Sequence, residues 1–230
     1  MNQILSDDPG NRLQAIRICR EIAGPGDLPQ LLDLLFVVKS EKDAHELELT
    51  IAAISSKISI PEQRGAAVIG KLEKTKEPKS RACLIRILGK IGDNSDLALI
   101  RLALHDENKD IQDAAVRALA DWPDLSPKYD LLQIIQETEN STHKILALRA
   151  YIRMIEMDKF QSPEGAVLSL ETALNLSSRP EEKKLVLGVL PVFSCRKALT
   201  LAESLLEDES VQDEARAAIE QIQKNMRSQP

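Results

Sequence analysis

Apolar residues recur along this chain with the 3.6-residue period of α-helices, and the whole pattern returns about every 33 residues. Arg81 begins the clearest copy of the repeating helix and is taken as position zero. The equivalent positions are then Arg12, Glu48, Arg81, Gln112, Lys144, Lys183 and Gln212. A unit restarting at such intervals is typical of an array of helical repeats.

Four columns of this alignment are apolar. They lie three, six, seven and ten residues after position zero, which in the Arg81 copy gives Leu84, Ile87, Leu88 and Ile91. These offsets share one face of a helix. Ser55 is the only polar residue that any copy places in them. The four columns are therefore predicted to form the core.

Six further helices are expected between the seven repeating ones, and several begin with capping signals such as Asp27, Ser126 and Ser162. Their predicted ranges are Asp27–Val38, Pro61–Lys74, Asn94–Leu104, Ser126–Thr138, Pro163–Leu176 and Arg196–Glu207. The sequence thus predicts an all-α fold with about 13 helices in six and a half repeats. We expect one domain over residues 1–230. Because no polar cap precedes the first helix, we expect the chain to be part of a longer protein.

Composition agrees with an all-α protein, since 43% of the residues are hydrophobic, only 3% are aromatic, and Gly and Pro are sparse. No apolar run is long enough to cross a membrane, so no membrane insertion is expected. Charged residues interrupt the first 20 residues, and no signal peptide is visible. The compartment stays open: cytoplasmic for the sequence as given, extracytoplasmic if a longer exported protein contains it.

Three cysteines stand far apart, each in or beside an apolar helical stretch: Cys19, Cys83 and Cys195. We expect small buried thiols and no disulfide, because Cys19 and Cys83 fall two repeats apart, beyond bridging distance. The net charge of −6 argues against binding of nucleic acid, which requires clustered Lys and Arg.

The copy from Arg81 through Leu88-Gly89-Lys90-Ile91-Gly92-Asp93 to His105-Asp106 resembles the short bacterial HEAT repeat, as does Ile111–Leu119. That resemblance implies a right-handed α-α superhelix, a HEAT-like solenoid whose repeating helix lines the concave face. Arg117–Asp124, Ala147–Ile152 and Arg179–Leu190 also look like the HEAT segment of large bacterial multidomain proteins. The second likeness implies an alternative role, as an accessory structural domain of a larger exported carbohydrate-active protein.

No catalytic constellation is visible, and we expect neither an enzyme nor a cofactor. Iron-binding hydroxylases of this fold resemble one another in several His-Glu pairs, whereas only His45-Glu46 is present here. The large aromatics Trp122, Tyr151 and Phe193 fall in core columns, which favours packing over base recognition. No nucleophile elbow or phosphate-binding glycine loop occurs.

One surface column is basic beyond what packing explains. Offsets five and nine from position zero supply the candidate partner-binding residues Arg17, Arg86, Lys90, Arg117, Arg149 and Arg153. Arg86 with Lys90, and Arg149 with Arg153, read as uncompensated pairs, while Arg17 and Arg117 have Glu21 and Asp121 four residues on. The column is either a solvated helix face or a basic strip that meets acidic groups on a protein partner. The second interpretation predicts a non-catalytic protein–protein interaction or scaffold module.

Overall fold

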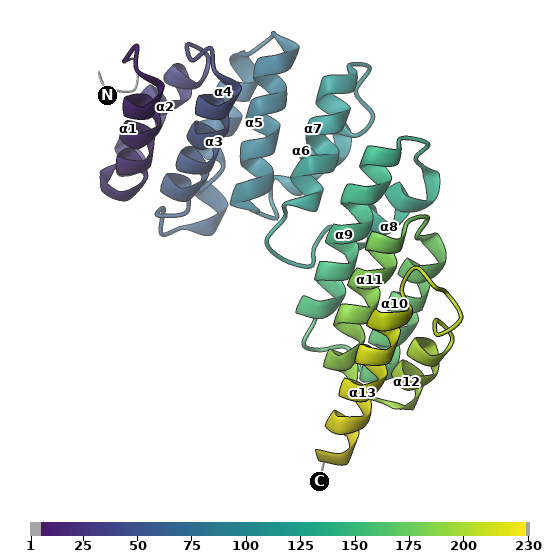
Figure 1. Ribbon diagram of the computed structural model, residues 1–230. Coiled ribbons are helices and arrows are strands. Elements are labelled where there is room, and N and C mark those ends of the chain that lie inside the picture. The colour runs from purple at the N-terminus through teal and green to yellow at the C-terminus, as the bar shows by residue number, and fades with distance from the viewer. Residues whose placement is uncertain (1–5, 229–230) are drawn as a thin grey trace. The chain divides into compact units, whose positions relative to one another are not determined.

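The computed structural model describes residues 6–228, and all regular secondary structure within them is helical (Figure 1). The all-α prediction and the expected number of helices are confirmed for this part of the chain. The thirteen α-helices are α1 (Pro9–Ile22), α2 (Leu28–Leu35), α3 (Glu41–Ser55), α4 (Ala66–Lys74), α5 (Pro78–Ile91), α6 (Leu97–Ala103), α7 (Lys109–Ala120), α8 (Lys128–Glu137), α9 (Ser141–Met157), α10 (Pro163–Leu176), α11 (Pro180–Val189), α12 (Arg196–Glu203) and α13 (Gln212–Ser228). Short 3-10 turns occur at Pro25–Asp27 (η2), Pro61–Gln63 (η3) and Leu190–Phe193 (η4).

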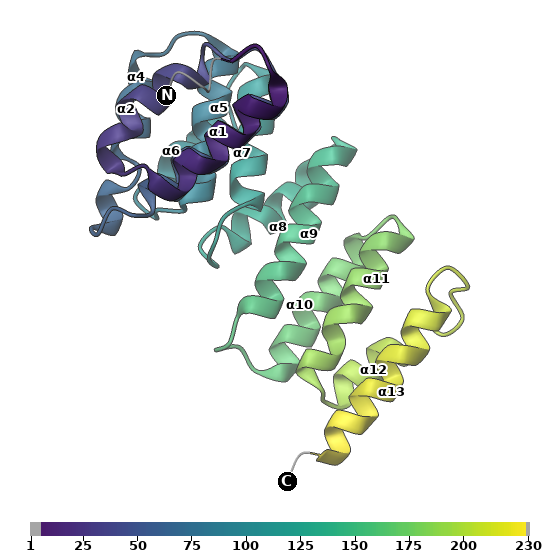
Figure 2. The ribbon, with the colours of Figure 1, turned by 60° about the vertical axis from the view of Figure 1, so that its left-hand side comes forward.

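The chain forms two compact units, Met1–Pro123 and Asp124–Pro230. In unit 1 the odd-numbered helices α1, α3, α5 and α7 pack side by side in one layer, and α2, α4 and α6 pack behind them (Figures 1 and 2). The odd-numbered helices are the repeating helices of the sequence pattern. They are called the odd layer of unit 1 below.

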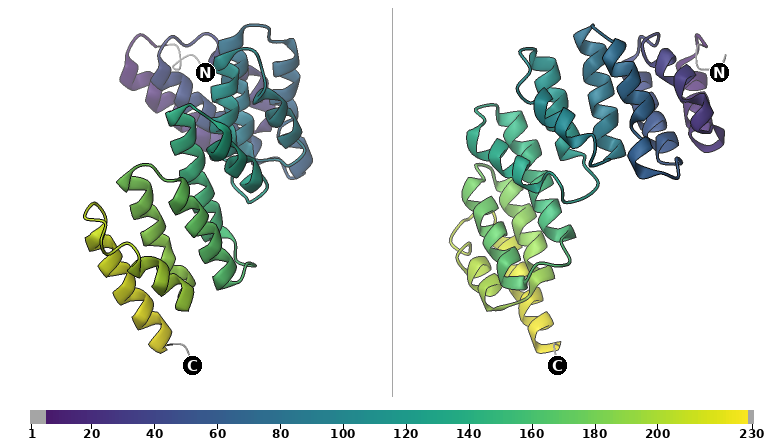
Figure 3. Two further views of the ribbon diagram at one scale, coloured as in Figure 1. Left: turned by 90° about the vertical axis from the view of Figure 1, so that its right-hand side faces the viewer. Right: turned by 180° about the vertical axis from the view of Figure 1, so that it is seen from behind.

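Unit 2 repeats this plan. Its odd layer consists of α9, α11 and α13, and α8, α10 and α12 pack against it, as the rear view of Figure 3 also shows. The solenoid superhelix and the single-domain span expected from the sequence stay predictions.

The predicted core columns are largely buried. Every residue of the offset-three column is buried, as are the aromatics Trp122, Tyr151 and Phe193. On α1, however, Ile18 and Ile22 are 47% and 77% exposed. The packing of α5 on α7 gives the reason. There Gly89, at offset eight of α5, packs against Ala118, at offset six of α7. Ile18 is the offset-six residue of α1, and no helix of the described residues precedes α1 to cover it in this way.

That close packing depends on Gly89, the offset-eight residue of α5. A Cβ added there would lie 2.4 Å from the Cα of Ala118 on α7 and 2.6 Å from its carbonyl oxygen. The two backbones therefore approach more closely than any larger side chain permits. Three residues later α5 ends at Gly92, whose φ of 67° is the left-handed conformation that favours glycine.

Side-chain caps begin five odd-numbered helices: Asp8, Ser40, Glu77, Asn108 and Asn140 accept from backbone N–H groups of the first turn. Among the even-numbered helices, the predicted cap Ser162 is confirmed, since its hydroxyl accepts from the Gly165 N–H.

The prediction for Ser126 is wrong, and Asp27 occupies the predicted capping position before α2 but makes no cap hydrogen bond with its side chain. The helix after Ser126 begins at Lys128 with Pro127 in the capping position. The Asp27 carboxylate instead accepts from the Gly24 N–H, because a 3-10 turn comes before α2 and uses that side chain. No helix within residues 6–228 is long and apolar enough to cross a membrane.

Candidate functional site

Position zero of the repeat has a structural role in four copies. The side chain there donates a hydrogen bond to the backbone carbonyl six residues earlier, in the turn that leads into the helix. The bonds are Arg12 to Ser6 (2.8 Å), Arg81 to Thr75 (3.3 Å), Gln112 to Asp106 (2.6 Å) and Gln212 to Leu206 (2.7 Å). These donors tie each turn to its helix, which explains why Arg and Gln recur in this column.

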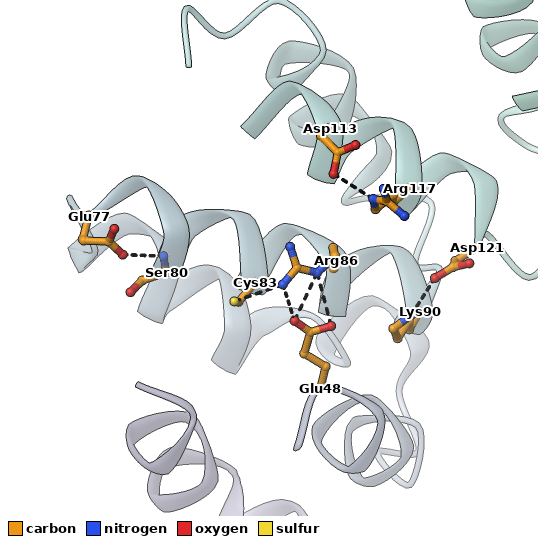
Figure 4. Close-up of polar contacts among 9 residues, drawn as sticks. All are labelled: Glu48, Glu77, Ser80, Cys83, Arg86, Lys90, Asp113, Arg117 and Asp121. Carbon is orange, nitrogen blue, oxygen red and sulfur yellow. Dashed lines mark hydrogen bonds and ion pairs between the residues drawn. The ribbon is translucent and has the colours of Figure 1, made fainter. Parts of the chain in front are cut away.

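Glu48 holds position zero of the second copy and cannot donate. Glu48 is 2% exposed, and its carboxylate accepts hydrogen bonds from Arg86 of α5, with 2.5 Å from Nη2 to Oε1 and 3.1 Å from Nε to the same oxygen (Figure 4). Burial lowers the pKa of Arg86, but the hydrogen bonds and charge of Glu48 outweigh it and raise that pKa above its ordinary value. Arg86 is therefore a fixed, neutralised cation.

Cys83 lies beside this ion pair, with its Sγ 3.1 Å from Nη2 of Arg86. Burial is the largest effect on the thiol and raises its pKa. Cys83 consequently stays protonated at neutral pH and is a poor nucleophile. The other two cysteines, Cys19 and Cys195, are also free thiols, and all three are half-buried rather than buried as expected.

Lys90 is neutralised as well. Its Nζ lies 2.5 Å from Oδ2 of Asp121 at the end of α7 (Figure 4). Arg117 could have paired with Asp121, four residues on, but it contacts Asp113 at 2.7 Å, one turn earlier on its own helix. The close approach of α5 and α7 brings Lys90 within reach of Asp121. The prediction that Arg86 and Lys90 are uncompensated is therefore wrong.

At the start of unit 1, Arg17 also pairs between helices. It contacts Glu46 of α3 at 3.1 Å rather than Glu21, and Arg20 contacts the same carboxylate at 2.6 Å. Burial raises the pKa of Glu46, but the hydrogen bonds and charges of Arg17 and Arg20 lower it below its ordinary value overall.

In unit 2, Arg149 of α9 contacts the buried carboxylate of Glu182 on α11, with Nη2 3.0 Å and Nε 3.2 Å from Oε1. Arg179 approaches the other oxygen at 3.6 Å. The prediction of an uncompensated Arg149 is wrong because, as with Arg86, a carboxylate of a neighbouring helix pairs with it. Arg153 donates from Nη1 to Sδ of Met157 at 3.3 Å.

The acidic partners were missed because sequence reasoning compared positions within one helix. Glu46, Glu48 and Glu182 stand at three different offsets, so they form no column. One signal was available: Glu48 lies between Leu47 and Leu49 in an otherwise apolar run, which is an unusual place for a carboxylate. Such a carboxylate needs a cation from a neighbouring helix.

An open groove of about 450 Å³ crosses the odd layer of unit 1 at this ion pair. Side chains of α3, α5 and α7 line it, four carboxylates against two cations. The polar residues are Glu41, His45, Glu48, Lys79, Cys83, Arg86, Asp110 and Asp113. A second hollow, of about 550 Å³, lies at the turn between α2 and α3 and includes Arg12 and Asp43, which pair at 2.7 Å.

Within residues 6–228 no group of three or more His, Cys, Asp and Glu residues is placed to hold a metal ion. The chain matches no protein-family model, and no curated protein is detectably similar to it in sequence. Membership of the HEAT-repeat family therefore stays a prediction, and the function has to be inferred from the geometry of the odd layers.

Proposed function

We propose that this protein is a non-catalytic interaction module that binds a protein partner along the exposed side of its odd layers. The main support is the groove of unit 1, where three successive odd-numbered helices contribute side chains to one open hollow of about 450 Å³. A surface built from equivalent positions of successive repeats suits an extended partner segment. The groove presents polar side chains of α3, α5 and α7, so its hydrogen-bonding groups are separated by the distance between neighbouring helices.

The state of the ionisable groups agrees with binding better than with catalysis. The Cys83 thiol has a raised pKa, and Arg86 and Glu48 neutralise each other. An acid, base or nucleophile usually needs a pKa tuned towards neutrality and freedom to reach a substrate. These groups instead hold the helices that form the walls of the groove.

The basic character expected of the partner-binding strip does not hold for unit 1. Arg17, Arg86, Lys90 and Arg117 each contact a carboxylate of their own unit. Exposed groups that line the groove, such as His45 and Lys79, are better placed than Arg86 to bind a partner. We therefore assign partner contact in unit 1 to these exposed residues, and a positioning role to the paired arginines of that unit.

Site-specific photo-crosslinking tests the proposal. A photoreactive amino acid replaces His45 or Lys79 on the odd layer, and Glu73 of α4 or Leu102 of α6 as controls on the even-numbered helices. All four side chains are exposed, so each variant is expected to fold. We expect the same protein to be captured from both odd-layer positions and from neither control. Equal capture from both layers, or none from either, would refute the proposal and favour a purely structural role.

A further inference from the structure

The odd layer of unit 2 exposes an apolar stripe along α11. Leu185 is 42% exposed and Val192, in the following turn η4, is 53% exposed, with Gly188 between them. Spacings of three and four residues place all three on one side of the helix. Gly188 and Val192 occupy offsets five and nine, where α1, α5, α7 and α9 carry charged residues. The repeat pattern therefore does not require apolar residues here.

Gly188 forms a gap in this stripe. A Cβ added at Gly188 would meet no atom within 4 Å. A glycine inside a helical segment costs up to about 1 kcal/mol relative to alanine, so an unused glycine is unfavourable. At Gly89 this cost is offset by the close packing of α7, whereas no atom of the described residues lies near the open position at Gly188. A small residue between two exposed apolar side chains suits the close approach of another backbone.

The flanks of the stripe differ in charge. On α9, the Arg149 side chain is 47% exposed, and among the described residues it holds Glu182 through Nε and Nη2, so that the N–H donors of Nη1 can face a partner. Glu182 and Leu185 are three residues apart on α11, so this guanidinium lies at the start of the stripe. On α13, the exposed residues at offsets five and nine are the uncharged Ala217 and Gln221, and the Glu214 carboxylate is neutralised by Lys184 of α11 at 2.6 Å.

We propose that an amphipathic helix of the partner docks along α11. Its apolar residues seat over Gly188 between Leu185 and Val192, and a carboxylate near one end of its apolar face binds Arg149. Apolar side chains in a helical groove supply affinity, and a guanidinium that meets a carboxylate fixes direction and register. This inference rests on the proposed function and names the partner chemistry for unit 2.

The test uses the full chain and a displayed library of short amphipathic helical peptides whose charged positions are randomised. Selection on the wild-type chain is expected to enrich peptides with an apolar face and an Asp or Glu at one end of it. Changing that acidic residue to its amide should weaken binding roughly tenfold. Enrichment of basic or neutral peptides, or no binders at all, would overturn the proposal.

Gly188→Leu fills the gap with a side chain whose Cβ would meet no atom within 4 Å, and Leu185→Gln removes one side of the stripe. Each is expected to weaken the selected peptides about tenfold or more while thermal unfolding is unchanged or raised. Gly70→Leu is the matched control. Gly70 is also a helical glycine with open space around it, but Glu73 and Lys74 follow one turn later. Equal binding by the wild-type, Gly188→Leu and Gly70→Leu chains would overturn the site.

Sedimentation separates a partner helix from a second copy of this chain. A wild-type dimer that Gly188→Leu abolishes would replace the proposed partner with self-association and overturn the inference. The crosslinking at His45 and Lys79 is independent of α11. If those crosslinks persist while α11 binds no peptide, only the present inference fails; if the odd-layer crosslinks are absent, the proposed function itself fails.

Discussion

Arg86 of α5 forms a two-nitrogen ion pair with the buried carboxylate of Glu48 on α3. The position that looked like the centre of a binding strip is thus a bond between neighbouring repeats. A buried carboxylate is tolerated only where a cation and hydrogen bonds compensate for its lost hydration. Glu182 and Arg149 repeat this arrangement in unit 2. The pair Arg86–Glu48 therefore links α5 to α3.

Arg86→Ala is expected to destabilise the protein by about 3 kcal/mol, because it leaves the charge of Glu48 buried and uncompensated. The double change Arg86→Leu with Glu48→Leu should cost clearly less than Arg86→Leu alone, since both charges then disappear. Urea unfolding of the wild type, the two single variants and the double variant measures the coupling. Additive effects of the two single changes would contradict the assigned pairing.

Gly89→Ala tests the close packing of α5 and α7. The new methyl group would overlap the backbone of Ala118, so a loss of roughly 1–3 kcal/mol is expected although alanine is the better helix former. Gly188→Ala is the matched control, because open space surrounds it and the same change should be neutral or stabilising. Thermal unfolding compares the two. Similar effects at both glycines would show that helix propensity, not packing, decides the outcome.

The buried Asp96 is expected to make the stability of the fold depend on pH. It is 3% exposed, and no hydrogen-bond donor among the described residues contacts its Oδ2; burial, followed by the charge of Asp93, raises its pKa. Because the folded state binds the proton more tightly, Asp96 stabilises the fold at low pH and loses this effect as pH rises through its raised pKa. Asp96→Asn should therefore stabilise the protein at pH 7 by about 1 kcal/mol and give no gain near pH 3.

Asp208 supplies a control of opposite sign. Its hydrogen bond from Lys183, with those from Ser210, lowers its pKa to about 2. Its contribution is present above the ordinary pKa of 3.8 and is lost as the pH falls towards 2, so Asp208→Asn should not stabilise the fold at pH 7. Urea unfolding at several pH values separates the two carboxylates. A stabilising Asp208→Asn would contradict the signs assigned here.

Gln112→Ala removes the bond from position zero to the Asp106 carbonyl, which spans 2.6 Å. A loss of about 1 kcal/mol is expected, the usual contribution of one such bond. Gln112→Arg should retain most of the stability, because Arg12 and Arg81 make the equivalent bond in their copies. The melting temperatures of the three chains provide the measurement. An Arg variant as unstable as the Ala variant would refute the structural role of this column.

Ser55 is the one polar residue in the predicted core columns, and its buried hydroxyl has no hydrogen-bond partner within residues 6–228. Ser55→Ala should raise stability by about 1 kcal/mol, since an unsatisfied buried hydroxyl is removed with little change in volume. Ser56→Ala, next in the chain, is a control: the Ser56 hydroxyl donates to the Ala52 carbonyl, so no gain is expected. Equal gains at both serines would contradict the interpretation of Ser55.

The local repeat could be predicted from sequence because it depends on short-range periodicity. Apolar residues at the positions of Leu84, Ile87, Leu88 and Ile91 recur in the other copies with the single exception of Ser55, and this spacing identifies the odd-numbered helices and their buried side. Turn residues such as Gly92 mark where helices end, because few residues adopt a left-handed backbone. The all-α class and the number of helices followed from these patterns.

The use of the charged residues was decided only by the tertiary structure. Within one helix Arg86 and Lys90 look like an uncompensated pair, yet Glu48 and Asp121 reach them from two different neighbouring helices. Ion pairing acts between side chains a few ångströms apart, and such distances depend on how closely two backbones approach. Gly89 sets that approach between α5 and α7. Helical periodicity is encoded along the chain, whereas charge compensation exists only after the helices have packed.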